Sequence, residues 1–90
     1  MLELRRGEKY QKAFHDKHPD AIVLESLSFP GIWNETKNRV EWSKENILYD
    51  AMIDFGSVDS PKKREPEHMT LVWYCSNEID AMAVKLTWCV

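Results

Sequence analysis

The chain has 90 residues, of which 43% are hydrophobic and 30% are charged, and its formal net charge is −3 at pH 7. This length suits one domain, and the apolar content can offset the entropy lost on ordering, which excludes a largely disordered chain. No apolar run approaches the ~18 residues that cross a bilayer, so we expect no contact with a membrane interior.

The charge is unevenly distributed along the chain. Residues 1–17 carry five basic and three acidic side chains, whereas residues 18–61 carry three basic and eight acidic ones. An acidic middle argues against a protein wrapped by nucleic acid, but the basic N-terminal segment leaves a one-sided contact open. The first residues contain no apolar signal core, and two cysteines are more typical of a reducing compartment than of a disulfide scaffold. We therefore expect a cytoplasmic protein.

The first predicted element is a short helix over residues 8–17, in which Tyr10 and Phe14 share one side. Pro19 ends this helix, because a proline disfavours the α conformation in the residue before it. Residues 21–29 are β-branched at the start and alternate later, which predicts a strand.

Two tryptophans, Trp33 and Trp42, flank the polar segment NETKNRVE. We predict strands at about 32–36 and 39–43, joined by a tight turn. With an even loop the two indoles lie across from each other in the core, which is favoured because apolar burial drives folding. With an odd loop the register shifts by one, and Trp33 points outward among charged side chains as a binding residue. The sequence leaves both registers open.

A helix over residues 44–55 is predicted next, from a serine N-cap, an acidic first turn and a glycine after the last turn. Its main apolar stripe would leave Tyr49 and Ile53 on a second apolar side, with Asp50 and Asp54 along one edge. Such a helix either lies between layers or offers its second side to a partner.

A polar loop at residues 57–68 precedes the segment 69–75, MTLVWYC, which is apolar on both faces and so predicts a central strand. Alternation over residues 82–90 predicts a further strand; the alternative is a helix from Asn77 with Ile79, Met82, Ala83 and Leu86 on its apolar side. Together the elements predict a single α+β domain. It would have a mainly antiparallel five-stranded sheet, with the 44–55 helix on one face and the N-terminal helix beside it.

Signatures of catalysis and metal binding are weak. His15 and His18 lie three residues apart, but a lone H-x-x-H lacks the second ligand pair of specific metal sites, so we expect no metal or other cofactor. Cys75 and Cys89 have no recognisable base nearby and resemble small buried hydrophobes. No phosphate-binding glycine loop or serine elbow occurs, and we therefore expect the protein not to be an enzyme.

The leading interpretation is a small interaction protein that binds the surface of a partner protein. It would act as an inhibitor, immunity or accessory factor, of the kind a phage or mobile element encodes. Tryptophan and tyrosine are the usual anchors of interfaces, and rim charges mainly set the association rate. Exposed sheet edges also allow a homodimer. The candidate residues are Trp33, Tyr49 and Ile53 as anchors, with Glu35, Glu41, Asp50 and Asp54 as a charged rim.

The alternative interpretation is a nucleic-acid-binding protein. Basic side chains would neutralise phosphates, and binding would weaken steeply as salt is raised. The candidate residues are Arg5, Arg6, Lys9 and Lys12, together with Lys62, Lys63 and Arg64 in the polar loop.

Overall fold

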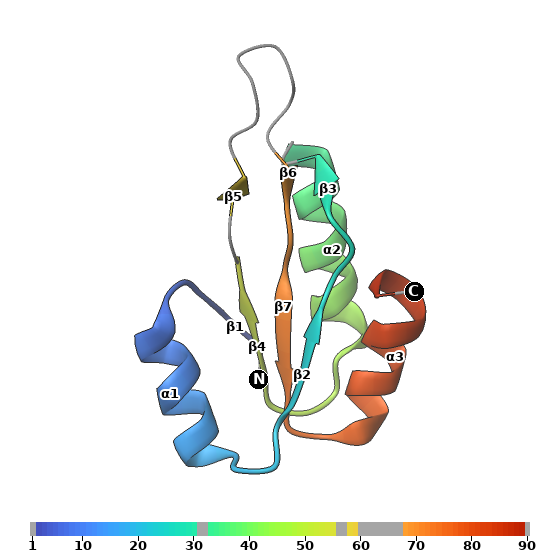
Figure 1. Ribbon diagram of the computed structural model, residues 1–90. Coiled ribbons are helices and arrows are strands. Elements are labelled where there is room, and N and C mark those ends of the chain that lie inside the picture. Colours follow the sequence, from blue (N-terminus) through green and yellow to red (C-terminus); the bar gives the residue numbers. More distant parts are fainter. Residues whose placement is uncertain (1, 31–32, 56–57, 60–67, 90) are drawn as a thin grey trace.

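The structure, a computed structural model, describes residues 2–30, 33–55, 58–59 and 68–89. These residues form an α+β fold, as predicted, but they form a four-stranded sheet and a small three-stranded sheet in place of the single five-stranded sheet that was expected (Figure 1). The helices are α1 (Glu8–Lys17), α2 (Trp33–Asn46) and α3 (Glu78–Trp88). The strands are β1 (Leu2–Arg5), β2 (Ile22–Glu25), β3 (Phe29–Pro30), β4 (Ala51–Asp54), β5 (Val58–Asp59), β6 (His68–Met69) and β7 (Val72–Cys75).

The main sheet has the strand order β1-β4-β7-β2, in which β1 is parallel to β4 and the other neighbours are antiparallel. The small sheet, β3-β6-β5, is antiparallel and is built from the same three stretches of chain as β2, β7 and β4. The central position of β7 confirms the prediction drawn from residues 69–75. Most of the predicted polar loop, residues 60–67, lies outside the described residues.

The register of the main sheet separates its side chains into two faces. One face packs against α2 and α3, and its rows are Leu4, Ile53, Trp73 and Leu24, and Leu2, Ala51, Cys75 and Ile22. On the other face Phe14 of α1 packs against Met52 and Tyr74. Figure 1 accordingly shows α1 apart from the other two helices. The bounds of α1 match the predicted helix at residues 8–17.

α2 replaces the two strands predicted at 32–36 and 39–43, so that prediction is wrong. The helix has no strong apolar stripe, but its charged side chains pair one turn apart: Arg39 Nη1 lies 2.9 Å from Glu35 Oε2, and Lys37 Nζ lies 3.7 Å from Glu41 Oε1. The Arg39 guanidinium also stacks between two aromatic rings, 3.9 Å from the centroid of Phe29 and 4.7 Å from that of Trp88. A cation held between two rings fastens this polar helix to the core.

Because α2 is a helix, neither of the two hairpin registers considered for the tryptophans exists. Trp42 is half-buried against the core and meets Trp88 edge to face, with ring centroids 6.0 Å apart and an interplanar angle of 90°. The side chain of Trp33 lies outside the described part of the chain.

The helix predicted at residues 44–55 is also wrong, since α2 ends at Asn46 and β4 begins at Ala51. Ser43 lies inside α2, where its hydroxyl donates to the carbonyl of Arg39 at 2.7 Å and accepts from the indole N–H of Trp73 at 3.0 Å. All four residues of β4 are buried, because the strand lies between β1 and β7 and between two helical layers. The apolar residues of β4, whose spacing also fits a helical stripe, therefore belong to a central strand.

The strand predicted at residues 82–90 is wrong, and the alternative helix from Asn77 is confirmed as α3. The Asn77 side chain caps the helix by accepting from the N–H of Ile79 at 2.8 Å. Asp80, in the first turn, is only 1% exposed. Its two carboxylate oxygens accept from the backbone N–H groups of Leu48, at 3.0 Å, and Tyr49, at 2.9 Å. This side chain therefore joins the loop before β4 to α3.

We expect Asp80→Ala to lower the free energy of unfolding by about 2–4 kcal/mol, because two backbone N–H groups lose their charged acceptor. Urea denaturation followed by tryptophan fluorescence measures the change. Glu45→Ala, at an exposed position of α2, is the control and should stay within about 0.5 kcal/mol of wild type. A loss for Asp80→Ala no larger than that of the control would contradict the role of this carboxylate.

Candidate functional site

The structure does not bring the predicted partner-binding residues together. Ile53 and Asp54 belong to the central strand β4 and are 0% and 4% exposed, so they do not lie on an exposed helix side as predicted. Gln11 of α1 donates a hydrogen bond to Asp54 at 2.5 Å, which ties α1 to the sheet. Glu35 and Glu41 lie on α2 in the ion pairs described above.

Tyr49 is the predicted anchor that the structure does expose. Tyr49 is 47% exposed and the preceding Leu48 is 73% exposed. Both lie in the loop before β4, whose backbone Asp80 holds against the first turn of α3. Asp50, the adjoining residue of the predicted rim, has an exposed side chain. The loop thus presents two large apolar side chains on a fixed backbone.

A larger apolar surface lies on α3 itself. Ile79, Met82 and Leu86 are 61%, 63% and 71% exposed. Their spacing of three and four residues places them on one side of the helix, and we call them the α3 surface. The opposite side of α3 buries Asp80, Ala81 and Val84.

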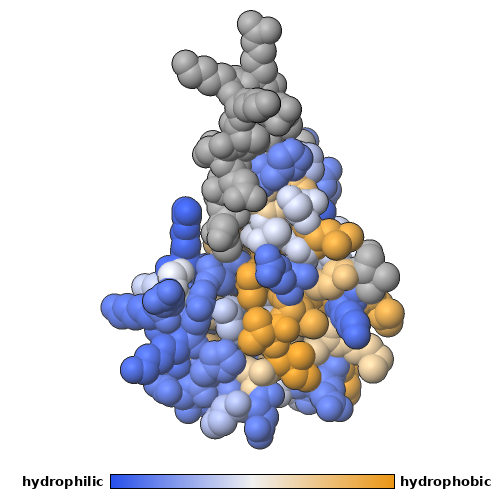
Figure 2. All heavy atoms as spheres, in the orientation of Figure 1, coloured by the Kyte–Doolittle hydropathy of each residue, from blue (hydrophilic) through white to orange (hydrophobic). Residues whose placement is uncertain are grey.

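A groove of about 340 Å³ runs between α3 and the edge strand β2, adjoining the α3 surface. Figure 2 shows apolar side chains gathered over β2 and α3, whereas the side formed by α1 is mostly hydrophilic. The molecule therefore has one apolar flank and one charged flank. The groove is lined by Ile22, Leu24, Glu78, Ala81, Met82 and Lys85.

The α3 surface was not recognised as a site from the sequence, although its residues formed the apolar side of the alternative helix. An apolar stripe at helical spacing normally indicates the buried side. In α3 the buried side instead contains Asp80, whose two backbone donors compensate for its burial. The position of Asp80, on the same side of the helix as Ala81 and Val84, is the one signal that could have raised this possibility.

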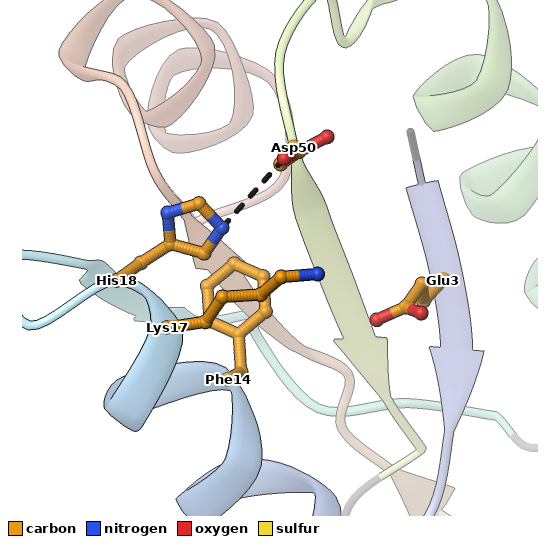
Figure 3. A pocket seen from close by; sticks show the side chains of 5 residues that line it. All are labelled: Glu3, Phe14, Lys17, His18 and Asp50. Carbon is orange, nitrogen blue, oxygen red and sulfur yellow. Dashed lines mark ion pairs between the residues drawn. The ribbon is translucent and has the colours of Figure 1, made fainter.

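A second, smaller pocket of about 200 Å³ lies between α1 and the edge of the sheet (Figure 3). His18 Nε2 is 3.7 Å from Asp50 Oδ2, and the His18 ring packs 4.8 Å from the ring of Phe14. A general base is typically a histidine hydrogen-bonded to a carboxylate, but 3.7 Å is longer than a hydrogen bond. The pocket lining, completed by Glu3 and Lys17, contains no serine, threonine or cysteine to serve as its nucleophile.

The two histidines of the H-x-x-H pattern have separate structural contacts. His15 meets Tyr74 edge to face, with centroids 5.5 Å apart, whereas His18 faces Asp50. Within the described ranges no three histidine, cysteine, aspartate or glutamate side chains lie close enough together to hold a metal ion.

The basic residues near the N-terminus form a small cluster around an aromatic ring. The Arg5 guanidinium lies 5.5 Å and the Lys9 ammonium 5.9 Å from the ring centroid of Tyr10, which is 39% exposed. Arg6 and Lys12 are exposed nearby in the chain. Lys62, Lys63 and Arg64 lie outside the described residues.

Both cysteines are free thiols, and neither has the features of a nucleophile. Burial, followed by the negative charges of Asp80 and Cys89, raises the pKa of the Cys75 thiol to about 12. Burial also raises the pKa of Cys89. A nucleophilic thiol requires the opposite shift, because the thiolate is the reactive species.

We expect Cys75 to resist Ellman's reagent at pH 8 in the folded protein and to react fully in urea. The variant Cys89→Ser isolates Cys75, and Cys75→Ser isolates the partly exposed Cys89, which should react first. Since folding raises the pKa of Cys75 above its ordinary value of 9.0, its contribution to stability is complete below pH 9 and is lost as the pH rises toward 12. Equal native reaction rates for the two variants would contradict this assignment.

No protein-family model, curated protein or solved structure matches the chain. Among the described residues, no helix is both long enough and apolar enough to traverse a bilayer. The candidate site therefore depends on the geometry of this chain alone.

Proposed function

We propose that the protein acts by binding another polypeptide through the α3 surface, as an inhibitor or accessory factor rather than as an enzyme. The observation that carries this proposal is the row of Ile79, Met82 and Leu86, each more than 60% exposed. Fully burying one such side chain contributes about 1.5–3 kcal/mol, so a row of three is a strong driving force for association. Contiguous exposed apolar patches typically mark interaction sites.

The rigidity of the backbone beneath this surface supports the proposal. α3 is capped by Asn77 and held by Asp80, and its inner side packs on both β2 and β7. A surface that is already ordered loses little conformational entropy on binding. Asp80 also fixes the loop that exposes Leu48 and Tyr49, but it does so from the buried side of α3, so these two side chains are separate from the α3 surface. Asp50 likewise belongs to the pocket beside His18.

The compartment and the origin that we propose rest on features of the sequence. The free thiols suit a reducing compartment, so we place this action in the cytoplasm. The small size and the lack of an assembled nucleophile and base in the described pockets suit an inhibitor or immunity protein of a phage or mobile element. The partner would be recognised by surface complementarity alone.

Site-specific photocrosslinking tests the proposed function. We expect p-benzoylphenylalanine in place of Met82 to give a covalent protein–protein adduct on irradiation in native cells, because Met82 is at the centre of the α3 surface. The same residue in place of Asp16, exposed on the hydrophilic α1 flank, is the matched control and should give none. Absence of an adduct from position 82, or equal adducts from both positions, would refute the proposal.

The cluster of Arg5, Lys9 and Tyr10 favours nucleic-acid binding as a second candidate function. Two cations beside a partly exposed ring could contact phosphates and stack one base. Arg6 and Lys12 would add two further phosphate contacts.

For this second function, the affinity for a fluorescent single-stranded oligonucleotide should fall roughly 50-fold between about 50 and 200 mM salt if four phosphates are contacted. Fluorescence anisotropy measures the affinity. Lys9→Gln with Lys12→Gln should flatten the salt dependence, whereas Met82→Glu should leave it unchanged. Binding that is absent at low salt, or equally salt-dependent in the Lys9/Lys12 variant, would exclude the function.

A further inference from the structure

The edge strand β2 has open backbone groups beside the α3 surface. β2 is the last strand of the main sheet, and just beyond it the N–H of Ser26 donates inward to the carbonyl of Leu71 at 2.8 Å. Because successive residues of a strand point their backbone groups to opposite sides, the N–H and C=O groups of Val23 and Glu25 point outward. An edge of this kind can pair with another strand.

The side of α3 that faces this edge carries opposite charges at its two ends, so it is complementary to the same side of a second copy. Glu78 lies at the start of the groove lining and Lys85 toward its end, with Met82 between them. α3 follows β7 after a short turn, so it runs back along β7 and in the same direction as β2 (Figure 1). A two-fold axis near the middle of α3 therefore places Glu78 of one chain beside Lys85 of the other. The two Met82 side chains then lie between the two charge pairs.

The spacing of the sheet agrees with such a pairing. α3 packs against β2 and β7 alike, so its axis lies over the space between them. Neighbouring strands are ~4.8 Å apart, and two copies joined at β2 would therefore hold their α3 axes about 10 Å apart. Packed helices lie about 8–10 Å apart, so the strand contact and the helix contact can form together.

We propose that the partner bound by the α3 surface is a second copy of this chain. The two β2 strands pair antiparallel, with Val23 of one opposite Glu25 of the other, a register that uses every outward backbone group of the strand. The α3 helices pack antiparallel, with two symmetric Glu78–Lys85 ion pairs around Met82. This inference rests on the proposed function, because it names the partner of the same surface. The α1 flank remains outside the dimer.

Sedimentation velocity of the full chain over a concentration series tests the proposal, with circular dichroism to verify folding. We expect a wild-type dimer. Glu78→Lys and Lys85→Glu each place like charges across the axis and should raise the dissociation constant about tenfold or more. The double variant restores opposite charges and should return the constant to within about threefold of wild type. A double variant that dissociates as readily as the single variants would overturn the proposed arrangement.

A second pair of variants tests the apolar centre. Met82→Glu places two carboxylates at the axis and should abolish the dimer, whereas Thr87→Glu, exposed outside the groove lining, should leave it intact. A dimer unaffected by Met82→Glu would overturn the inference.

The crosslink from position 82 separates this inference from the proposed function. An adduct of two copies supports self-association, and of the proposed function it supports only that the α3 surface binds a polypeptide. A monomeric wild-type chain that crosslinks to a different protein overturns self-association and leaves the proposed function standing, whereas the absence of any adduct overturns both.

Discussion

Burial of two adjacent strands, β4 and β7, on both faces of the sheet is the constraint on which the rest of the structure depends. Except for Asp54, their side chains are apolar on both faces of the sheet, so helices must cover both faces. α1 covers one face through Phe14, and α2 and α3 together cover the other. Polar contacts fix these helices in place: Ser43 with the indole of Trp73, and Asp80 with the loop before β4. The edge strands β1 and β2 need less covering by helices, and the apolar flank of the molecule lies beside β2.

Local signals in the sequence predicted the parts of the fold that depend on local physics. The C-terminal end of α1 follows from the proline after it, and the central place of β7 follows from a segment apolar on both faces. α2 could not be predicted in this way, because a guanidinium stacked between Phe29 and Trp88 fastens it to the core. That contact joins residues far apart in the sequence. The residues of β4 fit a helical stripe and a buried strand equally well, and pairing with β1 and β7 decides between them.

In the candidate site, too, some residues could be predicted from local sequence and others depend on the whole fold. Tyr49 was named from the sequence and is exposed, but Ile53 was placed on the outside only because β4 was taken for a helix. The α3 surface inverts the usual relation between polarity and burial. Hydropathy would place Asp80 outside and Ile79 inside, and two backbone N–H groups supplied from a distant loop reverse that order. The whole fold sets the position of those donors, so the hydropathy of α3 alone does not predict it.

Ser26 joins the two sheets by an unusual link. Where the chain leaves β2, the N–H of Leu71 donates to the Ser26 hydroxyl at 3.0 Å rather than to a carbonyl oxygen, while the N–H of Ser26 donates to the carbonyl of Leu71. The same hydroxyl donates to the carbonyl of Leu27 at 3.0 Å, so one buried side chain satisfies both a donor and an acceptor of the backbone where the pairing passes from the main sheet to the small sheet. The junction between the two sheets therefore depends on a single side chain and not on backbone pairing alone.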